Sequence, residues 1–174
     1  MKLTGAAVLF SFILFQVVLG DDDDQFTPIV QLKSGKVRGL VQEVSGQQQH
    51  FYQGIRYGTA KRFSSPTFAS SWTDVWNATK TRDSCPQPLA DPATRLIQGE
   101  AHSEDCLFLN IWAPANATKH EKKFPVMVWI HGGAFTIGTI FALSVDGKDL
   151  AAQGNIVLVA INYRFELSNN VTKI

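Results

Sequence analysis

A strand that ends in two glycines is the part of this sequence with the clearest capacity for chemistry. Residues 126–131, Val-Met-Val-Trp-Ile-His, form an apolar run rich in β-branched and aromatic residues, which predicts a strand buried on both faces. Gly132, Gly133 and Ala134 follow at once. Because these three residues lack bulky side chains, another molecule's oxygen could approach their backbone N–H groups closely. The stretch predicts an oxyanion hole or, in the simpler interpretation, a tight turn.

The elements that would position this turn form a βαβ unit. Residues 149–153 predict a short helix with Gly154 as its C-cap. Residues 156–163 form a second apolar run, which predicts a central strand covered on both faces. The order strand, turn, helix, strand is typical of a βαβ unit.

The residues before this unit predict short strands. Residues 107–112 alternate well enough to predict one strand. Nearer the N-terminus, Ser34-Gly35 and Ser45-Gly46 separate short β-type segments, which predicts hairpins. These segments cover residues 29–32, 36–41 and 50–52.

The segment 131–135, His-Gly-Gly-Ala-Phe, resembles the H-G-G-G/A-F motif of the type-B carboxylesterase and cholinesterase family of α/β-hydrolases. Other segments resemble further signatures of this family, and they follow the family's order. These segments are 54–57 (Gly-Ile-Arg-Tyr), 62–63 (Arg-Phe), 104–112 (Glu-Asp-Cys-Leu-Phe-Leu-Asn-Ile-Trp) and 161–164 (Ile-Asn-Tyr-Arg).

The resemblance assigns residues 28–164 to the N-terminal part of a type-B carboxylesterase domain. It implies a truncated α/β-hydrolase fold, in which hairpin strands precede the first strands of a central, mostly parallel sheet. It also implies that Gly132, Gly133 and Ala134 form the oxyanion-hole motif. The N–H groups of Gly133 and Ala134 would be the donors.

The catalytic triad of such an esterase is absent from this sequence. The family requires a serine on a G-x-S-x-G elbow, followed by an acid and a histidine, and no serine here has that spacing. The four histidines, His50, His102, His120 and His131, all precede the expected elbow. His131 is therefore interpreted as a residue that orients the turn. Residues 165–174 depart from the family pattern, which predicts a divergent tail on a product that ends before the catalytic serine.

The first residues predict export from the cell. Lys2 precedes an apolar stretch over residues 3–19, and Val18 and Gly20 stand where a cleavage site would have them, which predicts a signal peptide over residues 1–20. An uncleaved membrane anchor is the alternative, because the stretch is just long enough to span a bilayer. Four aspartates then begin an acidic spacer over residues 21–27, since adjacent carboxylates repel one another and stay hydrated. We expect a secreted, extracellular protein.

The two cysteines, Cys85 and Cys106, would meet an oxidising compartment in a secreted protein. A bond between them would contribute about 3 kcal/mol in the loop-entropy model, and two free thiols are the alternative. The family resemblance points to the same pairing. It also implies an ion pair between Arg62 and Glu104 near the bridge.

Three N-x-T sequences, at Asn77, Asn116 and Asn170, are glycosylation acceptors in a secreted chain. Asn116 is the best candidate, because it precedes a charged segment, residues 119–123, that must face solvent.

Composition excludes several other classes of protein. A chain with 45% hydrophobic and 18% charged residues is globular rather than disordered. Its net charge of +1 provides no field that would attract nucleic acid. We expect no cofactor and no metal ion, and the sequence carries no signal for an oligomeric state.

Two functions remain. The first is the N-terminal portion of a secreted serine esterase that acts on small-molecule esters through an acyl-enzyme and is inactive without its triad. It is favoured by the glycine turn, which an enzyme needs and an adhesion domain does not. The second is a fragment of a non-catalytic, cholinesterase-like adhesion or binding protein. The residue at the elbow position of a longer transcript would decide between them.

Overall fold

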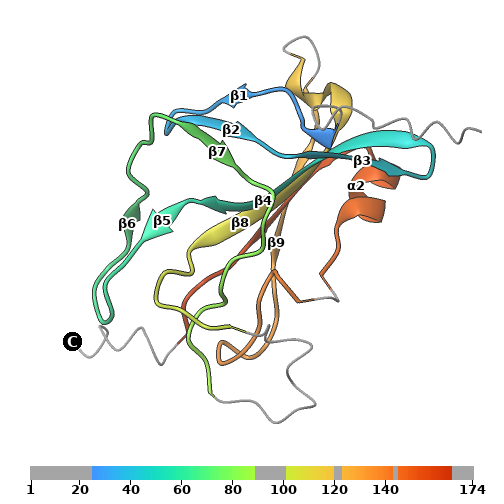
Figure 1. Cartoon of the computed structure of the whole chain (residues 1–174). Helices are drawn as coiled ribbons and strands as arrows, with labels where there is room; N and C mark the ends of the chain where they lie inside the picture. The colour runs from blue at the N-terminus through green and yellow to red at the C-terminus, as the bar shows by residue number, and fades with distance from the viewer. Residues whose placement is uncertain (1–24, 89–100, 120–122, 143–144, 166–174) are drawn as a thin grey trace, which may run out of the picture.

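The computed structural model describes residues 25–88, 101–119, 123–142 and 145–165, and a five-stranded sheet lies at its centre (Figure 1). In spatial order its strands are β3 (Leu40–Val44), β4 (Gln47–Arg56), β8 (Phe108–Pro114), β10 (Val157–Ile161) and β9 (Val126–Ile130). In the described residues, β10 and β9 pair in parallel, and the other neighbours in this sheet pair antiparallel. The described part of the sheet is therefore mainly antiparallel, with one parallel pair at β9.

Two smaller sheets and two short helical segments complete the described structure. Strands β1 (Val30–Gln31), β2 (Lys36–Arg38) and β7 (Val75–Asn77) form one sheet, and β5 (Gly58–Thr59) pairs with β6 (Thr67–Phe68). The helical segments are the 3₁₀ helix η2 (Ala115–Thr118) and the α-helix α2 (Lys148–Gly154).

The two faces of the five-stranded sheet pack against different elements. Successive residues of a strand point to opposite faces, and Ile111 and Trp112 of β8 accordingly belong to different apolar clusters. On one face Trp112 packs with Leu158 of β10 and Ala151 of α2. The other face packs against the small sheet through a cluster that includes Val37, Tyr52, Ile55 and Trp76. The hydrophobic core is thus divided between two layers.

The hairpins predicted near the N-terminus are confirmed. Ser45 and Gly46 join β3 to β4 with φ values of 51° and 76°, and two-residue hairpin turns of type I′ require positive φ at both positions. The single strand expected over residues 36–41 is wrong, because Gly39 divides it between two sheets. A Cβ atom at Gly39 would collide with the carbonyl oxygen of Phe51, so only glycine allows this close approach.

The predicted βαβ unit is confirmed, since β9, α2 and β10 follow one another and the two strands pair in parallel. The expected C-cap is wrong by one residue. Helix α2 includes Gly154, and Asn155 takes the left-handed conformation with φ 48° and ψ 48°. Its N–H donates to the last turn of the helix, at Ala151 and Ala152. Asparagine tolerates this conformation better than most residues.

The apolar runs suit strands that are covered on both faces, but within the described residues β9 and β10 do not have such cover. Strand β10 alternates between buried and half-buried positions. Every residue of β9 is exposed, from 47% at Met127 to 64% at Val126. No described element packs on either face of β9, which appears in none of the apolar clusters, and β9 is also the edge strand of the described sheet. An apolar sequence shows what a strand is suited to bury, and the elements packed on the sheet decide what covers it.

Candidate active site

The turn after β9 has an unusual backbone. Gly133, Ala134 and Phe135 have positive φ values of 120°, 53° and 59°. Residues other than glycine seldom adopt such values, and a bulky aromatic residue does so only under structural constraint. The constraint is visible at the carbonyl oxygen of Gly133, which accepts hydrogen bonds from the N–H groups of Thr136 (3.0 Å) and Ile137 (3.1 Å) and from the Thr136 hydroxyl (3.0 Å). These three donors hold the turn.

The carbonyl groups of Gly132 and Gly133 face hydrogen-bond donors of the protein, and the N–H groups of the same two peptides therefore point away from those donors. In a trans peptide the C=O and N–H bonds point in opposite directions. The Gly133 carbonyl faces its three donors, so the Ala134 N–H points away from them. The Gly132 carbonyl faces His131 Nδ1 at 2.9 Å, so the Gly133 N–H points away from the imidazole. Neither N–H has a hydrogen-bond partner in the part of the chain that the structure describes.

The His131 side chain supports the turn through a hydrogen bond to the Gly132 carbonyl. This side chain is buried, and because a carbonyl oxygen only accepts, Nδ1 carries the proton that it donates to Gly132. Burial lowers the pKa of His131, and the bond to Gly132 offsets part of that effect. The ring Nε2 is buried without a partner among the described residues, which also disfavours the charged form. His131 is thus a neutral residue that orients the Gly132–Gly133 peptide.

Tyr163 and Phe135 extend an aromatic group around His131. The Tyr163 ring stacks on the imidazole with centroids 4.4 Å apart, and its hydroxyl donates to the His131 carbonyl at 2.9 Å. Phe135 makes an edge contact with Tyr163 and remains 72% exposed. An exposed aromatic ring therefore follows the residues with the outward N–H groups directly in the chain.

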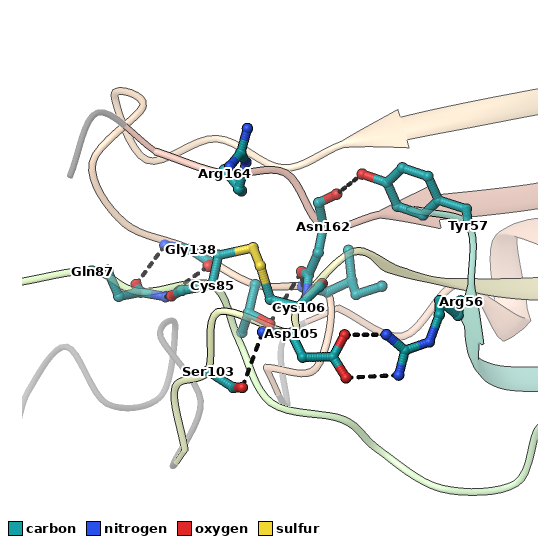
Figure 2. Close-up of a disulfide and its surroundings, with 12 residues drawn as sticks. Arg56, Tyr57, Cys85, Gln87, Ser103, Asp105, Cys106, Gly138, Asn162 and Arg164 are labelled. Atoms are coloured by element: carbon teal, nitrogen blue, oxygen red, sulfur yellow. Dashed lines mark hydrogen bonds and ion pairs between the residues drawn. A yellow bond between two sulfur atoms is a disulfide. The ribbon is translucent and has the colours of Figure 1, made fainter. Parts of the chain in front are cut away.

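A disulfide lies in the apolar cluster against which Tyr163 packs, and Figure 2 shows its surroundings. Cys85 and Cys106 are joined by it and fully buried, with Leu107 and Phe165 in the same cluster. Asn162 connects this cluster to the segment after the turn. Its amide donates to the Cys106 carbonyl at 3.4 Å, and its Oδ1 accepts from the Ile140 N–H at 2.9 Å. The chain after β10 is thereby fixed to the chain before β8.

Two arginines bind neighbouring carboxylates beside the disulfide. Arg62 Nε lies 3.4 Å from Glu104 Oε1, with both side chains substantially exposed, and this is the ion pair that the family resemblance implies. Arg56 forms a two-point pair with Asp105, in which Nη2 lies 2.6 Å from Oδ2. Arg56 also lies over the Phe108 ring, 4.8 Å from its centroid. This second pair was not predicted from the sequence, because β4 and the segment before β8 meet only in the folded sheet.

The remaining candidate residues lie apart from the turn. Asn77 is exposed at the end of β7, where its Oδ1 accepts from Arg38 Nε at 2.7 Å, and Asn116 is exposed in η2. His50 is buried in β4 and His102 is exposed. Asn170, His120, the signal peptide, most of the acidic spacer and most of the divergent tail lie outside the described residues. No described helix is long and apolar enough to cross a membrane.

Comparison with known proteins identifies the class to which this fold and turn belong. A profile of the carboxylesterase family matches residues 26–167, and the chain belongs to that family. A solved structure of a thermophilic PNB esterase superposes with a TM-score of 0.67 and 37% identity, over 80% of this chain and 28% of that one. The fold is therefore that of the α/β-hydrolases, of which the described residues form part.

Two curated relatives illustrate the range of the family. The chain is 39% identical over 140 residues to the para-nitrobenzyl esterase of Bacillus subtilis (strain 168), which covers 78% of the chain and 27% of that protein. It is 35% identical over 174 residues to the cholinesterase of Mus musculus, covering 94% of the chain and 28% of that protein. The chain thus spans little more than a quarter of the length of these relatives.

Proposed function

We propose that this chain is the N-terminal portion of a secreted carboxylic ester hydrolase, and that its glycine turn provides two donors of the oxyanion hole. The observation that carries the proposal is the pair of adjacent N–H groups on Gly133 and Ala134. The carbonyls of the same two peptides, on Gly132 and Gly133, accept hydrogen bonds that fix the direction of these N–H groups. Donors of this kind, fixed before the reaction, stabilise the negative charge that develops on the substrate carbonyl oxygen.

In the proposed reaction this chain binds the oxyanion but does not attack the ester. The serine nucleophile, the base and the acid would come from further residues of the parent protein, and the third donor would be the N–H after that serine. Each good donor is worth about a hundredfold or more in turnover. Without a nucleophile the tetrahedral intermediate never forms, so the 174 residues alone are proposed to be inactive.

Activity measurements on the isolated chain test this division of roles. The chain should hydrolyse p-nitrophenyl acetate no faster than a control protein without a nucleophile, and a serine-directed organophosphate should leave no adduct. Stoichiometric labelling of any serine in the chain would overturn the proposal.

Sequencing the full transcript tests the assignment to an enzyme. A G-x-S-x-G elbow downstream, with the acid and histidine after it, is expected. Any other residue in the place of that serine would identify the parent as a non-catalytic binding or adhesion protein.

We also propose secretion with N-linked glycans on Asn77, Asn116 and Asn170. The exposure of Asn77 and Asn116 is compatible with modification. Expression in a eukaryotic secretory cell should give glycopeptides that lose mass after enzymatic glycan release. Thr79→Ala and Thr118→Ala should each abolish one of them. Unmodified peptides at both positions in secreted or reticulum-retained protein would contradict this assignment.

A further inference from the structure

The side chain of Gln87 connects the disulfide to the segment behind the glycine turn (Figure 2). Gln87 is two residues beyond Cys85 and is 7% exposed. Its Nε2 donates to the carbonyls of Cys85 and Gly138, each at 3.1 Å, and its Oε1 accepts from the Gly138 N–H at 2.9 Å. The amide therefore binds both polar groups of Gly138, as a neighbouring strand would. This contact fixes a residue 51 positions away in the chain.

Gly138 in turn fixes His131. Its φ is +127°, and a Cβ atom there would collide with the imidazole and with the Gly132 carbonyl oxygen. The backbone of Gly138 thus packs directly behind the His131 ring. Because His131 Nδ1 binds the Gly132 carbonyl, a displacement of Gly138 would release the ring and then the Gly132–Gly133 peptide.

We propose that Gln87 is a positioning residue of the oxyanion turn, and that it couples the Cys85–Cys106 disulfide to the orientation of the Gly133 N–H. The catalytic meaning of this coupling rests on the function proposed above. The coupling itself is a property of the described residues, and it can be measured without any ester.

Hydrogen exchange of the turn measures the coupling directly. The N–H groups of Thr136 and Ile137 are bonded to the Gly133 carbonyl and therefore report whether the turn is closed. Gln87→Met keeps the length of the side chain but removes its donor and acceptor. We expect these two amides to exchange at least about tenfold faster in this variant, since the buried N–H and C=O of Gly138 both lose their partner.

Gln31→Met is the matched control. Gln31 lies in β1, is exposed and donates from its side chain to the Leu32 carbonyl at 2.7 Å. Exchange at the turn should be unchanged in this variant. Equal effects of the two substitutions, or no effect of Gln87→Met, would overturn the proposal.

Gln87→Glu separates a positioning role from a merely structural one. A protonated carboxyl has one donor and one acceptor and can bind both groups of Gly138, whereas a carboxylate only accepts. Burial and the need to donate should raise the pKa of this carboxyl above about 4.3. The quantity to follow is the exchange rate of the Thr136 and Ile137 amides in Gln87→Glu, divided by the wild-type rate at the same pH. We expect this ratio to approach unity near pH 5. Near pH 8 it should rise toward the ratio found for Gln87→Met.

The titration of His131, which packs against Gly138, occurs in the wild type as well, so the ratio of rates removes its direct contribution. A pH-independent ratio in Gln87→Glu, equal to that of Gln87→Met, would show that the amide acts only by filling space.

Reduction of the disulfide tests the other end of the connection. Reduction should speed exchange at the turn in the wild type and add little in Gln87→Met, because contacting residues of one network are not additive. Fully additive effects would show that the disulfide does not act through Gln87. If the parent proves to be an esterase, Gln87→Met should lower kcat more than it changes KM. The kcat of Gln87→Glu, divided by the wild-type kcat at each pH, should rise toward unity as the pH falls. An inactive parent would refute the proposed function while leaving the exchange results to decide the role of Gln87.

Discussion

At the scale of single residues, the two glycines of the turn differ in how well they should tolerate substitution by a residue with a Cβ atom. Gly133 has a positive φ, and a Cβ atom there would collide with the Ile137 carbonyl, whereas no atom lies within 4 Å of the Cβ position at Gly132. Gly133→Ala should therefore lower the free energy of unfolding by about 2 kcal/mol or more, and Gly132→Ala by less than about 1 kcal/mol. Urea unfolding of the two variants checks this difference. Equal losses would show that the turn can relax around a methyl group.

The buried histidines predict a loss of stability at mildly acidic pH. Burial lowers the pKa of both His50 and His131, so the unfolded chain takes up protons near pH 6.5 that the folded chain does not. The stability that depends on the two neutral histidines is therefore fully present above about pH 6.5. It is lost as the pH falls from about 6.5 toward the lowered pKa of the folded state.

Unfolding at several pH values between about 7 and 5 measures this effect. His50→Leu should reduce the slope of the unfolding free energy against pH by up to about 1.4 kcal/mol per pH unit, the limit for one proton. His102→Gln, at an exposed position, is the control for general effects of removing an imidazole. An unchanged slope in His50→Leu would contradict the prediction.

At the scale of elements, the disulfide joins the segment that follows β7 to the segment that precedes β8. It joins residues 21 positions apart, and the loop-entropy model gives such a bond about 3 kcal/mol. Replacing both cysteines by serine should lower the unfolding free energy by about 2–4 kcal/mol. The reduced wild-type chain, measured in parallel, should lose a similar amount. A loss well below 1 kcal/mol in both would mean that the contacts of Gln87 and Asn162 hold this region without the bond.

At the scale of the whole molecule, the exposed strand β9 governs how the isolated chain behaves. It is an edge strand in the described sheet, and all five of its residues are apolar and exposed. An apolar edge without charged residues favours pairing with another chain. The 174 residues expressed alone should therefore self-associate or be retained in the secretory pathway.

Sedimentation velocity of two lysine variants tests the role of β9. Val128→Lys should increase the monomer fraction, because a charged side chain in the strand opposes edge pairing. Leu150→Lys removes an equally exposed apolar residue from α2 and should have little effect. A monodisperse wild-type monomer with a cooperative melting transition would refute the argument.

The sequence by itself determined the features that depend on neighbours along the chain. The apolar runs at 126–131 and 156–163 and the glycines after the first run predicted two strands and a turn. The structure has the strands at Val126–Ile130 and Val157–Ile161. With two cysteines in the chain, one intramolecular pairing was possible. The family was recognisable because its motifs are short contiguous segments.

Tertiary structure alone decided which elements became neighbours. The period of apolar residues does not state the order of strands, so the edge position of β9 and the division of residues 36–41 at Gly39 emerged only from the folded sheet. Gln87 gave no signal in the sequence, because a polar residue in a loop is normally solvated. Its two bonds to Gly138 form when the chain closes over 51 positions, and local pattern carries no information about contacts at that separation.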